Sequence, residues 1–174
     1  MIDVWAEIRT VMKVDVNWGE RNANGTFLVK AKDVASAVRF LQARGEWGRF
    51  EGHIPYKWKG DARGMVTSVM LAPSFKITMP TWPAYRNQQQ EIKDDWDAMY
   101  SALRKHEDGH REIFDGGVRK LVKDLEALGV VKGGGVKSTV RKAAGVIQKK
   151  HDSYDTRTEH GRLTGVVLRV PQPE

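Results

Sequence analysis

The sequence predicts an α+β fold: one domain, residues 1–174, in which a short, mostly antiparallel sheet packs on a long helix. Three observations support this fold class. The 174 residues, 40% of them hydrophobic, suffice for one buried core. Short stretches in the first half alternate apolar and polar residues, as half-buried strands do. The middle of the chain repeats apolar residues every three or four positions, as an amphipathic helix does.

Four strands are predicted in the first half of the chain. Apolar and polar residues alternate over residues 11–18, and a second strand, residues 26–30, follows a turn at residues 22–25. Residues 65–71 and 74–79 are separated by an Ala-Pro pair, which indicates a hairpin or a tight corner. The last of these strands is either an edge to which an extended peptide could add or an internal strand.

A helix and a long connection are predicted between these two pairs of strands. Asp33 is a suitable N-cap for a helix over residues 34–44, and Gly45 would end it. Residues 45–64 are rich in Gly, Trp and charge without a clear period, so we expect them to form a connection over the surface.

The long helix is predicted over residues 91–128, although Gly116-Gly117 could bend or break it. Its buried stripe contains two histidines, which is unusual for an apolar face. The residues of the stripe are Ile92, Trp96, Met99, Leu103, His106, His110, Ile113, Gly117, Leu121, Leu125 and Leu128.

The last third of the chain is predicted to contain a second helix and a final strand. Residues 133–135 are glycines and indicate a loop, and residues 136–150 have the pattern of a helix with a basic exposed side. Residues 151–161 show no clear period, so we expect irregular structure there. Residues 165–170 predict a closing strand.

The sequence His-Glu-Asp-Gly-His at residues 106–110 has the spacing of a metal-binding helix. Residues four apart lie on the same helical face, so His106 and His110 can reach one cation. In this motif Glu107 acts as general base on a metal-activated water. Ordinary core or boundary histidines are the alternative, but two buried imidazoles and a carboxylate lose solvation unless a metal or a polar cleft satisfies them. We therefore predict a Zn²⁺ site with His106 and His110 as ligands.

The motif supplies only two ligands, and the helix itself offers no good third one. Ile113 and Gly116 stand where one subclass of such motifs has a glycine and a further histidine. Glu126 would lie about 24 Å from His110 along an unbroken helix, and Glu112 would point about 160° away from it. The segment of residues 154–161 is a better source, because it concentrates hydroxyl, carboxylate, guanidinium and imidazole groups.

Three blocks of the sequence together resemble the DUF922 family. They are Ile-Thr-Met-Pro-Thr-Trp at residues 77–82, the helical His-Glu-x-Gly-His, and Tyr-Asp-x-x-Thr-x-His-Gly at residues 154–161. The resemblance covers roughly residues 50–164. DUF922 proteins are regarded as bacterial zinc-dependent proteases, so the resemblance implies a small zincin-like metallopeptidase domain. It also implies a secreted or periplasmic location.

The resemblance places the remaining functional residues in the third block. By position, His160 would be the remaining zinc ligand, with Asp155, Glu159 and His151 as rival ligands. Asp155 could instead orient a ligand imidazole or cap a turn, and His151 could be a surface residue. Tyr154 is a candidate catalytic residue that donates to the oxyanion of the tetrahedral intermediate, or else fills the core.

Composition restricts the partners. The absence of cysteine excludes disulfides and thiolate ligands, and no apolar run approaches the roughly 20 residues of a membrane span. The net charge of +7 comes from scattered Lys and Arg, which argues against nucleic acid and would suit an anionic envelope surface. The start of the chain lacks the pattern of a secretory signal, so the sequence leaves the compartment unassigned.

The function expected from these observations is that of a zinc-dependent endopeptidase that hydrolyses peptide bonds of a peptide or protein substrate. Two alternatives stay open at this point. One is a non-catalytic zinc-binding interaction module, and the other is a delivered bacterial toxin or an envelope-processing domain.

Overall fold

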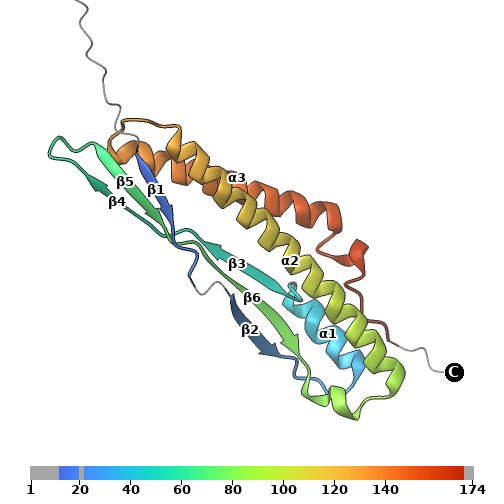
Figure 1. The fold of residues 1–174 in the computed structure, drawn as a ribbon. Helices are drawn as coiled ribbons and strands as arrows, with labels where there is room; N and C mark the ends of the chain where they lie inside the picture. The colour runs from blue at the N-terminus through green and yellow to red at the C-terminus, as the bar shows by residue number, and fades with distance from the viewer. Residues whose placement is uncertain (1–11, 20–21, 171–174) are drawn as a thin grey trace, which may run out of the picture.

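The computed structural model describes residues 12–19 and 22–170 and has an α+β architecture. Figure 1 shows two layers, a ribbon of strands and a set of helices that lie on one face of it. The strands are β1 (Lys13–Val16), β2 (Asn22–Leu28), β3 (Arg49–His53), β4 (Tyr56–Gly60), β5 (Val66–Leu71) and β6 (Ser74–Thr81). The helices are α1 (Val34–Arg44), α2 (Gln90–Glu126) and α3 (Gly133–Thr158), with 3₁₀ helices η1 (Pro83–Asn87) and η2 (Arg162–Thr164).

Within the part of the chain that the structure describes, the strands form two three-stranded sheets, in the orders β1-β5-β4 and β2-β6-β3. Each central strand has one parallel and one antiparallel neighbour, so the prediction of one mostly antiparallel sheet is wrong. The reason is that β1 and β2, from the start of the chain, pair in parallel with strands that come much later. The two sheets follow one another along the molecule, because β5 continues into β6 through the Ala72-Pro73 corner rather than folding back on it.

Two stretches without a recognised strand pattern nevertheless belong to the sheets. Residues 22–25, predicted as a turn, lie in β2, and residues 45–64, predicted as a surface connection, contain β3 and β4. β2 pairs with β6 along its whole length, so ladder hydrogen bonding overrides the turn preference of Asn and Gly. Residues 74–79 form most of β6, which is central in its sheet, so they are internal and offer no free edge.

Helix α1 has the predicted bounds. Asp33 accepts a hydrogen bond from the backbone N–H of Ser36 at 2.8 Å, and the Ser36 hydroxyl accepts one from the backbone N–H of Asp33 in return. Gly45 follows the helix with a φ of 79°, a conformation that other residues rarely adopt. The capping residues at its two ends therefore define where this helix begins and ends.

Helix α2 is continuous over 37 residues and is not broken at Gly116-Gly117. Gly117 is buried, and a Cβ built on it would collide with the side chain of Ile147 in α3. The glycine therefore serves close helix packing rather than a bend. The buried stripe differs from the predicted one at Phe114, which is buried where Ile113 is only partly so.

Helix α3 is longer than predicted at both ends. It starts at Gly133, inside the expected loop, and the ring of Trp58 packs where a Gly133 side chain would be. It continues to Thr158, so most of the stretch 151–161 is helical and not irregular. Residues 165–170 do not form the predicted strand. Val166 and Leu168 are buried, so their alternation reflects packing on the helix layer without a partner strand.

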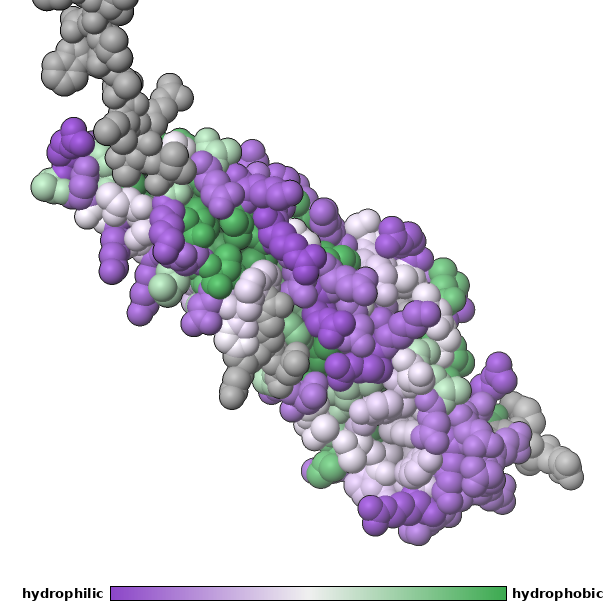
Figure 2. Space-filling view, viewed as in Figure 1, coloured by the Kyte–Doolittle hydropathy of each residue, from purple (hydrophilic) through white to green (hydrophobic). Residues whose placement is uncertain are grey.

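The core lies between the sheet layer and the helix layer. On the face seen in Figure 2, hydrophobic residues are visible in a band along the upper half of the molecule, and hydrophilic residues surround them. The largest core cluster joins α1 and β6 to α2 from Trp96 to Val118, and a second cluster joins β5 to the last turns of α2 and the start of α3. Within the described residues, no helix is both long enough and apolar enough to cross a membrane.

Candidate metal centre

The two histidines of the motif lie on the buried side of α2, one turn apart. His106 is 4% exposed and His110 is 7% exposed, and their ring centroids are 4.9 Å apart. The helical spacing of four residues puts both rings on one face, as the sequence predicts. Because both are buried, each ring needs polar partners from another part of the chain.

Those partners come from the last turns of α3, which packs beside α2 (Figure 1). Asp155 Oδ1 lies 3.2 Å from His106 Nε2 and 3.0 Å from His110 Nε2. His106, His110 and Asp155 thus form a group whose three ligand atoms lie within 4.8 Å of one another. Ligands held about 2.0–2.1 Å from a tetrahedral ion lie about 3.3 Å from each other, so the donor spacing suits one small cation.

Burial sets the charge state of the imidazoles. It lowers the pKa of His106 and of His110 below the usual value of 6.5, and the Asp155 carboxylate opposes this only in part. Both rings are therefore neutral at neutral pH. Neutral imidazole is the form that can donate a lone pair to a metal, so the electrostatics agree with the geometry.

Glu107 is the third polar residue buried in this part of α2, at 4% exposed. Burial, with additional repulsion from Asp155 and Glu46, raises the pKa of its carboxyl to about 8. Its side chain lies under the backbone that leads into β3, where a Cβ on Gly48 would stand 2.5 Å from Glu107 Oε1. A cation bound near by would favour the ionised carboxylate and so oppose the raised pKa.

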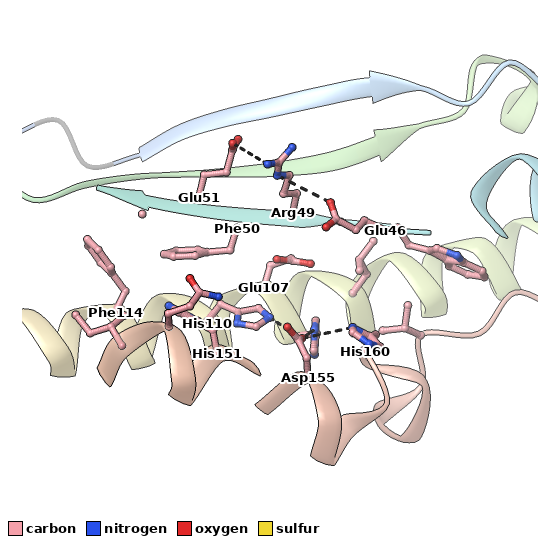
Figure 3. Close-up of a pocket in the computed structure, with 18 of the residues that line it drawn as sticks. Glu46, Arg49, Phe50, Glu51, Glu107, His110, Phe114, His151, Asp155 and His160 are labelled. Atoms are coloured by element: carbon pink, nitrogen blue, oxygen red, sulfur yellow. Dashed lines mark hydrogen bonds and ion pairs between the residues drawn. The ribbon is translucent and has the colours of Figure 1, made fainter. Parts of the chain in front are cut away.

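A cleft with a volume of about 810 Å³ opens over these groups, between β3 on one side and α2 and α3 on the other. Figure 3 shows His110, His151 and Asp155 in its middle, Phe114 at one end, and Glu46 and His160 at the other. Glu107 lines it beneath β3. The cleft gives a ligand access to the buried polar group.

β3 borders the cleft as an edge strand of its sheet. Among the described residues it pairs only with β6, so its other side has no strand partner. Phe50 of β3 packs over the His110 and His151 rings, with centroid distances of 6.2 and 5.4 Å. The free edge that the sequence suggested in β6 is thus in β3 instead.

The two other predicted site residues lie close to the group but not within it. Tyr154 stacks on His106 at 4.9 Å and 16°, and its hydroxyl fills the space left by Gly109. His160 lies at the mouth of the cleft with its side chain 82% exposed, and its Nδ1 is 4.0 Å from Asp155 Oδ1. The oxyanion role of Tyr154 and the ligand role of His160 stay predictions.

The three rival ligands differ in how close they lie to the two buried histidines. Asp155 is central, whereas Glu159 is paired with Arg162. His151, considered a surface residue from the sequence, is partly buried, and its Nδ1 lies 2.8 Å from His110 Nδ1. One sequence signal could have found this arrangement: His151 and Asp155 are four residues apart, the same spacing as His106 and His110.

Comparison with known proteins agrees with the resemblance seen in the sequence. A family model described as "Bacterial protein of unknown function (DUF922)" matches residues 10–161. The chain belongs to the DUF922 family. None of the curated proteins and none of the solved structures searched matches this DUF922 chain.

Proposed function

We propose that this protein is a zinc-dependent endopeptidase, with His106, His110 and Asp155 as the metal ligands and Glu107 as the general base. The observation that carries the proposal is the convergence of two buried, neutral imidazoles on one carboxylate oxygen, beside a buried glutamate and under an open cleft. Two histidines and one carboxylate, with a position left for water, are a donor set of catalytic zinc sites.

A bound divalent ion supplies Lewis-acid chemistry, because it polarises the scissile carbonyl and makes water a stronger nucleophile. Glu107 takes the proton from the attacking water and transfers it to the leaving nitrogen. Its burial beneath Gly48 keeps bulk water away from this carboxyl. Its place in the lining of the same cleft as His106 and His110 supports this role.

The free edge of β3 supports a peptide as the substrate. An extended chain lying in the cleft could add to β3 through main-chain hydrogen bonds, which place its carbonyl groups over the metal ligands. Such pairing depends on the backbone and so suits internal peptide bonds of many sequences. A secreted or periplasmic location, and an anionic envelope surface as a contact, belong to the same proposal.

Zinc analysis and a peptidase assay test this proposal together. The purified protein is expected to hold about one zinc per chain, and its cleavage of an unfolded protein substrate should cease when a chelator removes the metal and return when zinc is added back. Magnesium added instead should not restore activity. Zinc without cleavage would indicate an interaction module, and absence of zinc would contradict the site.

The third ligand can be tested separately. Asp155→Ala is expected to weaken zinc binding far more than His160→Ala, because Asp155 Oδ1 lies about 3 Å from both Nε2 atoms whereas the His160 side chain is mostly exposed. Competition with a zinc-binding dye would measure both affinities. An equal or larger loss in the His160 variant would identify His160 as the ligand expected from the sequence.

A further inference from the structure

His151 has no role in the proposed reaction, yet it is within hydrogen-bond distance of His110, one of the proposed metal ligands. Its Nδ1 lies 2.8 Å from His110 Nδ1, on the side of the His110 ring opposite to Asp155. We propose that His151 is a positioning residue for His110, and that this contact makes the free Nε2–H of His151 a hydrogen-bond donor to the carbonyl oxygen of a bound peptide. This inference rests on the proposed function.

The hydrogen bond between His110 and His151 links the position of the proton on one ring to its position on the other. If His110 Nε2 gives its lone pair to a cation, the proton of the neutral His110 ring must be on Nδ1. That N–H then donates to His151 Nδ1, which must carry a lone pair. A neutral His151 ring consequently has its own proton on Nε2, so metal binding at one ring determines the tautomer of the next.

The Nε2 atom of His151 is exposed to solvent. His151 lines the cleft, and among the described residues no hydrogen-bond partner is found for its Nε2. His151 Nε2 is not one of the buried atoms without a hydrogen-bond partner, because it is accessible to solvent. A peptide carbonyl in the cleft is an acceptor of the right kind. The ring of Phe50, at a centroid distance of 5.4 Å, packs against His151 and limits its rotation.

His106 provides a contrast within the same site. Its Nδ1 is buried and has no hydrogen-bond partner among the described residues, and its ring is held by stacking on Tyr154 instead. The two metal ligands are thus oriented in different ways, one by packing and one by a hydrogen bond. Only the hydrogen bond fixes which nitrogen of the ring carries the proton.

Two variants separate the two roles of His151. Asparagine can place an amide oxygen near the position of Nδ1 but cannot reach the position of Nε2, whereas phenylalanine keeps the packing on Phe50 and offers neither group. His151→Phe should weaken zinc binding by about 10- to 100-fold, and His151→Asn should restore affinity close to that of the parent. Lys149→Ala, exposed on the same helix, is the control.

The donor role is measured by peptide binding to zinc-loaded protein in which Glu107→Gln prevents turnover. In that background both His151 variants should bind a peptide about 3- to 10-fold more weakly, the loss expected for one hydrogen bond. Nitrogen-15 NMR of the zinc-loaded parent should show the Nε2–H tautomer for His151. This last measurement needs no substitution, so it stands even if a variant fails to fold.

Three results would overturn the inference: unchanged zinc affinity in His151→Phe, an Nδ1–H tautomer for His151 in the zinc-loaded parent, or unchanged peptide binding in both variants. Failure of the proposed function looks different. If the parent binds zinc but cleaves no peptide, the peptidase proposal is wrong, while zinc affinity and the NMR tautomer still decide whether His151 positions His110.

Discussion

Replacement of Glu107 by glutamine is expected to leave zinc bound and to lower peptide hydrolysis by about 10²- to 10⁴-fold, the usual contribution of a general base. The amide has the size of the carboxyl but cannot accept the proton from the attacking water. Glu107 is not one of the three grouped ligand residues, so zinc affinity should not fall with activity. Zinc titration and steady-state cleavage of a fluorogenic peptide measure the two quantities separately.

The glutamine variant should also fold normally. The parent carboxyl is buried and has its pKa raised to about 8, so a neutral group fits this environment without a loss of unfolding free energy. Glu112→Gln, exposed on the same helix, is the matched control and should behave as the parent. Parent-like turnover in the Glu107 variant would show that another group takes the proton.

Replacement of His106 by alanine is expected to abolish both zinc binding and the stabilisation that zinc provides. At a zinc concentration of 100 times Kd, a single site adds about 2.7 kcal/mol to the unfolding free energy, and the variant should lose this amount. Thermal unfolding with and without zinc measures it. Lys105→Ala, on the exposed neighbouring position, should keep the full zinc response.

The same variant tests how the site is connected. The metal would join α2 to the end of α3 through Asp155, so its loss should accelerate amide hydrogen exchange first in the last turn of α3 and in residues 159–161. Exchange in β5 and around Leu121 and Leu125 at the end of α2 should change little, because these residues belong to the other core cluster. A uniform change along the chain would argue against a metal bridge between the helices.

The parts of this fold that the sequence predicts well are those with local signals. The α1 bounds follow from Asp33 and Gly45, and the position of His106 and His110 on one face of α2 follows from a spacing of four residues. The parallel pairing of β1 with β5 and of β2 with β6 joins residues far apart in the sequence, and no local pattern records it. The mixed sheets therefore could not be predicted.

The sequence also failed to predict two segments at the candidate site, the end of α3 and the strand β3. The last turns of α3 look irregular in the sequence because the positions that face α2 include His151, Tyr154 and Asp155, which are polar, so the apolar stripe of an amphipathic helix is missing there. The same holds for β3, where Gly52 stands under Phe114 and removes a side chain from the alternating pattern. Polar and small residues at the candidate site thus hide the helix and strand patterns of the segments that contain them.

Two glycines of α2 allow α3 to approach it closely. Gly109 leaves room for Tyr154 and Gly117 leaves room for Ile147, so α3 contacts α2 closely at points on either side of His110. Aspartate has a short side chain, and Asp155 can span the gap to both imidazoles only because the backbones approach so closely. Neither glycine offers an atom to a cation, yet together they set the distance between the two helices at His106, His110 and Asp155. A methyl group added at either glycine would push the helices apart and lengthen the distances between the carboxylate and the two imidazoles.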